Sequence, residues 1–412
     1  MALAGTPPAA RAPAAAPARP LRFALVVVTV LFFMWGFLTS LNDILIPHLR
    51  GLFALSYVQA ALVQFTFFGA YFLMALPSGR IVERRGYQRG IVIGLAVAGL
   101  GAALFYPAAA NASYGLFLGA LFVLASGITL LQVAANPYVA VLGPPETASS
   151  RLNLTQAFNS VGTTIAPLVG GALILGNARA ASAADDAARV QGPYVALAAA
   201  LLVLAGVFAV LRLPQIGGEA EGGSFGRVLG IRHVVLGAAA IFLYVGAEVA
   251  IGSFLVNFMG LPRVAGLAER DAANHVSYYW GGALVGRFVG AAALQRARPG
   301  AALAAAAAGA AALTLVATLS GGRLAMWALL AVGLCNSIMF PTIFTLGIAG
   351  LGALTGAASS LLVMAIVGGA LVPVLHGALA DRVGLQAAFA LPAVCYLFIV
   401  YYGLRGSRRD AA

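Results

Sequence analysis

The chain is dominated by about a dozen apolar stretches, each long enough to cross a lipid bilayer. Hydrophobic residues make up 62% of the sequence and charged residues only 9%, whereas a soluble protein carries about 25% charged residues. A bilayer core about 30 Å thick requires roughly 20 apolar residues per helix, and the alternation typical of a membrane β-barrel is absent. We therefore predict an all-α membrane protein with twelve transmembrane helices, at 22–47, 57–80, 88–107, 114–142, 151–175, 192–213, 231–259, 273–294, 299–319, 323–349, 353–378 and 384–404.

The sequence contains no lysine, and this argues against several membrane machines. A retinal-based pump requires a lysine Schiff base, and the Walker sequence of ATP-driven carriers requires a phosphate-binding lysine. The four histidines lack the spacing of a metalloenzyme, and the two cysteines both fall inside expected spans. We therefore expect no enzymatic activity, no cofactor and no metal site.

The net charge of +12 reflects membrane topology. Most of the 24 basic residues, 17 of them, lie on one side of the expected spans, chiefly at 80–89, 212–232, 296–298 and 405–409. Cytoplasmic loops carry an excess of arginine and lysine. We therefore predict a multi-pass protein of the plasma (inner) membrane with both termini in the cytoplasm, embedded in lipid and without a nucleic-acid partner. We expect a monomer.

Similar landmarks recur in the two halves of the chain. Asn136-Pro137 corresponds to Phe340-Pro341, and Gly79-Arg80 corresponds to Gly286-Arg287, at an offset of about 204–207 positions, which indicates an internal repeat of the kind transporters use. The predicted organisation is a disordered tail (1–20), an N-terminal six-helix bundle (21–213), a cytoplasmic linker (214–230), a C-terminal six-helix bundle (231–404) and a short tail (405–412).

Two acidic residues lie inside expected spans. Asp43 is late in span one, one helical turn after Thr39, and Glu248 is in span seven, one turn after Tyr244. An ionised side chain at the centre of a bilayer costs at least about 2.5–3.5 kcal/mol, so its presence is a functional hypothesis by default. An acid that takes up and releases a cation couples ion flow to transport, so both are candidate cation-coupling residues. The alternative is an acid close enough to a span end to reach water.

Spans four and five each carry a stripe of polar side chains at helical spacing. Carboxamides both donate and accept hydrogen bonds, as sugar hydroxyls do, although Asn and Gln also join membrane helices to one another. The stripes favour a water-lined cavity for a neutral polyol. The candidate sugar ligands in these spans are Gln132, Asn136, Gln156 and Asn159.

Two further candidates come from the second half. Asn336 precedes Pro341 in span ten, and Trp280 lies in span eight beside Tyr278 and Tyr279. Aromatic rings stack on sugars, but they also gather at the membrane interface. We interpret the tyrosines as interface residues and retain Trp280 and Asn336 as sugar ligands. His275 and His376 are expected to be solvated at span ends.

The loop after span two combines glycines with both signs of charge. Beyond its effect on orientation, this loop is expected to act as a latch that closes in one conformation and opens in the other. The candidate gating residues are Gly79, Glu83, Arg84, Gly86 and Arg89, with Arg287 in the second half.

The latch is similar to the Gly-x-x-x-Asp-Arg-x-Gly-x-x-Arg signature of the major facilitator superfamily, with Glu83 in the acidic position. The segments that resemble its fucose–galactose–glucose:cation symporters are 41–45, 134–139, 151–160 and 341–348. This resemblance implies a major facilitator fold and cation-coupled sugar uptake. It also implies that Asp43 carries the proton, whereas Gln132 stands where the fucose branch has a titrating glutamate. The glucose/galactose branch, with a glutamine there, is closer.

The prediction is therefore a secondary active importer that couples a hexose, glucose or galactose, to H⁺ or Na⁺ by alternating access. The alternatives are an L-fucose:proton symporter, a sugar sensor that does not transport, and a drug or metabolite exporter. The carboxamide stripes argue against the last of these, because drug exporters of this fold favour apolar cavities.

Overall fold

The computed structural model describes the backbone of residues 18–53, 57–111, 113–174, 183–214 and 224–408, and the side chains of 21–37, 40, 62–111, 113–166, 191–214 and 225–408. Within these ranges the chain is helical and forms no strand. An isolated helix satisfies its own backbone hydrogen bonds in lipid, which is why long apolar sequences adopt it there. Eight helical stretches are long and apolar enough to cross a membrane.

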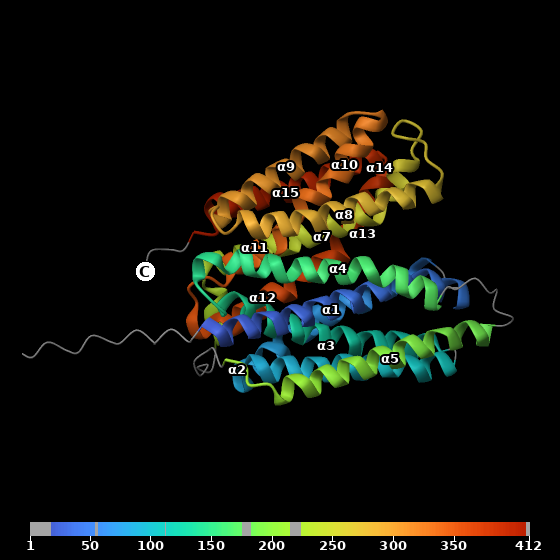
Figure 1. Ribbon diagram of the computed structural model, residues 1–412. Helices are drawn as coiled ribbons and strands as arrows, with labels where there is room; N and C mark the ends of the chain where they lie inside the picture. Colours follow the sequence, from blue (N-terminus) through green and yellow to red (C-terminus); the bar gives the residue numbers. More distant parts are fainter. Residues whose placement is uncertain (1–17, 54–56, 112, 175–182, 215–223, 409–412) are drawn as a thin grey trace, which may run out of the picture.

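The helices form two bundles that lie one above the other in Figure 1. The first bundle contains α1 (Ala18–Phe53), α2 (Tyr57–Ala110), α3 (Tyr114–Val141), α4 (Ala148–Ile174) and α5 (Ala183–Val210). The second contains α7 (Arg232–Gly260), α8 (Glu269–Ala293), α9 (Pro299–Leu319), α10 (Gly322–Asn336), α11 (Met339–Gly347), α12 (Thr355–Met364), α13 (Gly368–Val383), α14 (Leu385–Ala388) and α15 (Ala390–Tyr401). The short α6 (Ser224–Leu229) lies inside the segment predicted to be a linker.

Twelve passes result from these helices, because α2 contributes two and three passes are each built from a pair of helices: α10 with α11, α12 with α13, and α14 with α15. The twelve-helix prediction is confirmed. The breaks inside the last three passes were not predicted.

α2 contains two passes that join at Gly86. This residue has φ 80° and ψ 165°, a conformation that is essentially restricted to glycine. The expected loop between spans two and three is therefore reduced to a single kinked residue.

Gly86→Ala is expected to lower the free energy of unfolding by about 1–3 kcal/mol, because alanine strains the kink. A methyl group would meet no other atom there, so backbone strain is the only cost. The measurement is the Tm of the detergent-purified protein. Gly69→Ala is the matched control, because it also points into open space but lies in ordinary helix; equal Tm values for the two variants would contradict the expectation.

The bundles meet along a seam formed by α2, α3 and α4 of the first and α8, α11, α12 and α13 of the second. Its hydrogen bonds include Ser149 Oγ with Thr345 Oγ1 at 2.6 Å and Ser150 Oγ to the Ala291 carbonyl at 2.5 Å. Both lie near the basic end of the molecule, which carries 80–89, 142–147, 294–298 and 405–408. The bundles are therefore bonded to each other at the basic end.

Candidate functional site

The two passes that pack against each other across the middle of the seam, α4 and α8, are among the more polar ones. Within the residues whose side chains are described, neither is among the eight helices apolar enough to count as a membrane span by composition. Polar side chains on a membrane helix turn toward the protein interior. The polar sides of these two passes therefore face one another, and more apolar helices contact the lipid.

α3 presents two of the predicted amides. Gln132 Nε2 donates to the Tyr71 hydroxyl of α2 at 2.8 Å, and Gln132 Oε1 is buried without a hydrogen-bond partner in the described part of the chain. Asn136 is fully buried, and neither its Nδ2 nor its Oδ1 is bonded there. A buried polar group left unbonded costs about 1–3 kcal/mol. A polar ligand or a water molecule that bonds these amides would recover that cost.

The amides of α4 are used differently. Asn159 Nδ2 donates to the Phe32 carbonyl of α1 at 2.9 Å, and Asn153 Nδ2 donates to the Ser149 carbonyl of its own helix. Asn159 therefore joins α4 to α1, whereas Asn153 donates within α4. Gln156 is 5% exposed and lies one turn before Ser160, facing the seam.

The second bundle places Asn336 at the end of α10. Its Nδ2 donates to the Tyr279 hydroxyl of α8 at 2.8 Å, and its Oδ1 is buried and unbonded. A methyl group at Gly333 would overlap the Tyr279 carbonyl, so glycine is what lets α10 approach α8 closely enough for this bond.

Pro341 explains the break between α10 and α11. Proline has no N–H and cannot donate to the carbonyl four residues earlier, which belongs to Ser337. Arg287 Nε donates to that carbonyl at 3.4 Å instead. The single proton of the Tyr244 hydroxyl lies between the Asn336 carbonyl at 3.1 Å and Glu248 Oε1 at 2.8 Å. Side chains of α8 and α7 thus satisfy the opened backbone.

The predicted acid Glu248 lies in this same group. The Tyr244 hydroxyl is 2.8 Å from Glu248 Oε1, and Arg287 lies within electrostatic reach of the carboxylate. The sequence suggested that this acid is isolated. In the structure it has a counter-charge on α8.

Arg287 also reaches across the seam. Its guanidinium donates to the Ser160 hydroxyl and to the Gln156 carbonyl of α4. The structure thus places this predicted gating residue in the middle of the seam, beside a predicted sugar ligand, and away from the latch after span two.

Trp280 lies two helical turns before Arg287, on the same face of α8. Its indole is 45% exposed and lies against Gly252 of α7, one turn beyond Glu248. Trp280 thus lies beside α7, on the side of Arg287 away from the basic end.

Two of the remaining gating residues, Gly79 and Glu83, meet the second bundle at the basic end. Gly79 packs against Ser360 and Glu83 against Gly356, both on α12. Arg84 and Arg89 are exposed, as is Gly86. The predicted set thus divides between two places, the basic end and the centre of the seam.

Asp43 lies on α1, but its side chain is outside the described residues, as is that of Thr39. The part of the chain whose side chains are described contains no cluster of three or more metal-ligating side chains.

Sequence reasoning misjudged three aromatic or titratable residues. Tyr279 is fully buried against Asn336, so its interpretation as an interface residue was wrong, whereas Tyr278 is 57% exposed and packs on Trp327. His376 is not solvated but buried between Phe254 and Phe389. Tyr71 was not considered, although its separation from Tyr279 is close to the repeat offset.

Comparison with known proteins supports this architecture. The family model described as Major Facilitator Superfamily matches residues 25–366. The glucose/galactose transporter of Brucella abortus (strain 9-941) is 57% identical over 389 residues, covering 94% of each chain. The L-fucose-proton symporter of Escherichia coli (strain K12) is 36% identical over 396 residues, covering 90% of each chain.

The structural comparison agrees. A crystal structure of a Major Facilitator Superfamily transporter in the outward conformation superposes with a TM-score of 0.88 at 35% identity, covering 95% of this chain and 100% of that one. Fold and sequence therefore lead to the same conclusion. The chain belongs to the Major Facilitator Superfamily, and within it to the fucose–galactose–glucose symporter family.

Proposed function

We propose that this protein is a secondary active sugar importer that carries glucose or galactose together with a cation. The observation that carries the proposal is the set of buried amides of both bundles, Gln132, Asn136 and Asn336, whose carbonyl oxygens all lack partners in the described chain. Hydroxyl groups complement both the donors and the acceptors of amides. The names of relatives that are 57% and 45% identical, both glucose/galactose transporters, support a hexose.

Alternating access follows from the arrangement of the seam. The bonds of Ser149 and Ser150 join the bundles at the basic end, and positive loops favour the cytoplasm. We infer that this is an outward-facing state with cytoplasmic termini, in the inner membrane and as a monomer. Sugar and cation then shift the equilibrium toward an inward-facing state.

The coupling ion is proposed to be a proton. A relative that is 36% identical is named a proton symporter, and Gln132 cannot titrate, which leaves Asp43 and Glu248 as the carboxylates of the expected pathway. Asp43 is the first choice as carrier, because Glu248 already has Arg287 as its counter-charge.

L-fucose is the second candidate substrate. Its support is the same 36% identical symporter. The higher identity of the relatives named glucose/galactose transporters favours glucose or galactose.

Uptake by proteoliposomes tests the proposal. Labelled glucose, galactose and fucose are each offered under an imposed proton gradient and, separately, a sodium gradient. Concentrative uptake of glucose or galactose under the proton gradient is the expected result. Uptake of none of the three sugars under either gradient would refute sugar import, and accumulation driven by sodium alone would replace the proton.

Gln156→Ala is expected to raise the apparent KM for sugar by about threefold to tenfold, the range that corresponds to one lost hydrogen bond. The measurement is initial uptake rate against sugar concentration. Gln386→Ala is the control, because Gln386 caps the end of α9 through the Ala317 and Ser320 carbonyls and its loss should affect stability without affecting KM. An unchanged KM in Gln156→Ala would assign this residue to packing.

A further inference from the structure

The Gln132–Tyr71 pair has a counterpart in the other bundle, the Asn336–Tyr279 pair. In each pair an amide nitrogen of the fourth pass donates to a tyrosine hydroxyl of the second pass, at 2.8 Å in both cases. Each partner of the first pair is followed by its equivalent roughly 204–208 residues later, as an internal repeat requires. The same device therefore occurs once in each half of the chain.

Both pairs leave the same atom unbonded. Gln132 Oε1 and Asn336 Oδ1 are buried and have no hydrogen-bond partner within the described ranges. The two amides are 5% and 1% exposed, and the tyrosines Tyr71 and Tyr279 are 2% and 0% exposed. The tyrosine takes one of the two N–H donors and fixes the plane of the amide, and the carbonyl oxygen is the amide atom that has no bond.

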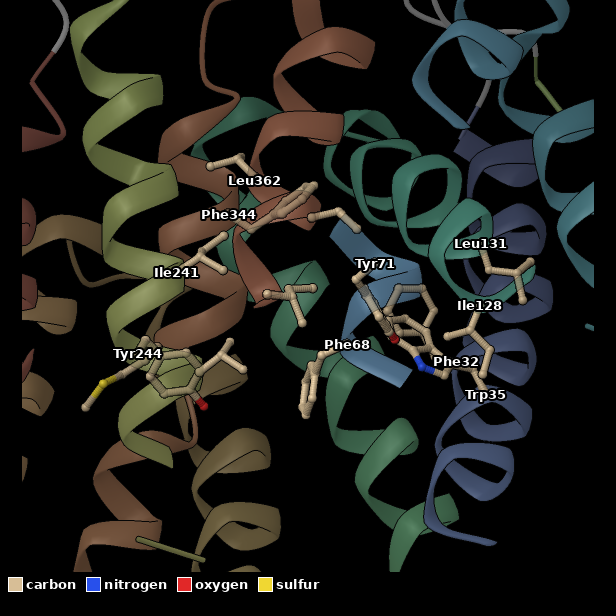
Figure 2. Packing of buried hydrophobic residues seen from close by; sticks show 14 of the residues in the cluster. Phe32, Trp35, Phe68, Tyr71, Ile128, Leu131, Ile241, Tyr244, Phe344 and Leu362 are labelled. Atoms are coloured by element: carbon tan, nitrogen blue, oxygen red, sulfur yellow. The ribbon is translucent and has the colours of Figure 1, made fainter. Parts of the chain in front are cut away.

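Both pairs also lie beside the seam. Phe68, one turn before Tyr71, packs on Gly369 of the second bundle, and Figure 2 shows Phe68 between Tyr71 on one side and Tyr244 on the other. Tyr244 in turn bonds the carbonyl of Asn336. The two pairs therefore lie on either side of the region where the bundles meet.

One neighbouring group could satisfy Asn336 without a ligand. The Tyr396 hydroxyl lies close to this amide, yet neither it nor Asn336 Oδ1 makes a bond of hydrogen-bond geometry within the described chain. The Tyr396 hydroxyl is therefore the one neighbouring group that competes with a sugar hydroxyl for Asn336 Oδ1 among those described.

We propose that Tyr71 and Tyr279 are positioning residues, which orient Gln132 and Asn336 so that each bundle presents one acceptor to a hydroxyl donor of the sugar. This inference rests on the proposed sugar transport and adds its recognition chemistry. The substrate must donate two hydroxyl protons, one to each bundle, and so its binding joins the two halves.

The test compares sugar analogues modified at one hydroxyl at a time. A deoxy sugar lacks the group, and a fluoro sugar keeps a weak acceptor but cannot donate. At the two positions that meet Gln132 and Asn336, both analogues should lose about tenfold or more in kcat/KM, and equally, because a buried acceptor is left unpaired. Retention of the fluoro but not the deoxy analogues would show amides that present NH₂, and would overturn the inference.

Tyr71→Phe and Tyr279→Phe remove only the hydroxyl groups. Each amide can then rotate, so discrimination against the analogues at one position should fall to about threefold or less, at a different position for each variant. Tyr138→Phe is the matched control, because its buried ring also loses one hydroxyl bond, to the Pro214 carbonyl near the basic end, and its discrimination should stay as in the parent. Tyr396→Phe should also leave discrimination unchanged.

The failures are distinguishable. A parent protein that transports no hexose refutes the proposed function. A parent that transports hexose while Tyr71→Phe and Tyr279→Phe discriminate as it does refutes the positioning role alone.

Discussion

Asp43→Asn should abolish concentrative sugar uptake while leaving exchange of labelled sugar across the membrane. A potential of 100 mV is worth about 2.3 kcal/mol per charge, and about 1.4 kcal/mol is a factor of ten, so coupling to one proton permits about fiftyfold accumulation of a neutral sugar. Asparagine has nearly the same size as aspartate but carries no titrating proton. The accumulation ratio should therefore fall to about one.

The two readouts separate coupling from binding. Proteoliposomes loaded with unlabelled sugar report exchange, which requires sugar binding and movement of the bundles without net proton transfer. Asp381→Asn is the control, since Asp381 is an exposed acid near the end of α13 and should accumulate sugar as the parent does. Uphill accumulation by Asp43→Asn would remove this residue from the coupling mechanism.

Much of the architecture could be predicted because insertion in a membrane strongly constrains the amino-acid composition of each segment. Lipid requires long apolar helices, and the arginines mark one set of loops. The break at Ser337 and Ile338 was harder to predict from the sequence. Both halves have a proline at the equivalent position, but Pro137 leaves α3 continuous, whereas a helix ends before Pro341. The difference lies in partners from other passes, Arg287 and Tyr244, which hold the opened carbonyls.

The candidate site was predictable in its residue types but not in its pairings. Spacing along one helix identifies a polar stripe, yet it does not show which amide bonds a neighbouring helix. Asn159 donates to α1, whereas Asn136 makes no bond in the described chain. Arg287 and Glu248 lie on different helices, and only the packing of α7 on α8 brings them together.

Arg287 interacts both with the acid Glu248 and with the opposite bundle. It lies near Glu248, bonds the opened backbone at Ser337, and donates across the seam to Ser160 and Gln156 of α4. Glu248 and Arg287 are both half-buried and interact electrostatically. Removing one charge leaves the other without its counter-charge, whereas removing both keeps the net charge of the site unchanged. Single and double variants of Glu248 and Arg287 can therefore distinguish the effect of an unbalanced charge from the loss of the link that Arg287 makes between the bundles.

Glu248→Gln and Arg287→Gln should each slow sugar exchange by at least about tenfold, and the double variant should restore the stability of the folded protein. The double variant should nonetheless fail to hold the basic end closed, because hydrogen bonds from a charged donor, worth about 1.5–3 kcal/mol, no longer reach α4. That loss corresponds to a shift of about tenfold to 150-fold in the equilibrium between the two states.

A pair of cysteines at Ser149 and Thr345 reports this shift, because their hydroxyl oxygens are 2.6 Å apart when the basic end is closed. With the native Cys335 and Cys395, both unpaired, replaced by alanine, the Ser149→Cys/Thr345→Cys protein should cross-link rapidly. Adding Glu248→Gln and Arg287→Gln together should slow the cross-linking by about tenfold or more. Cross-linking as fast as in the parent, in a double variant that folds, would show that Arg287 serves Glu248 alone and does not hold the bundles together.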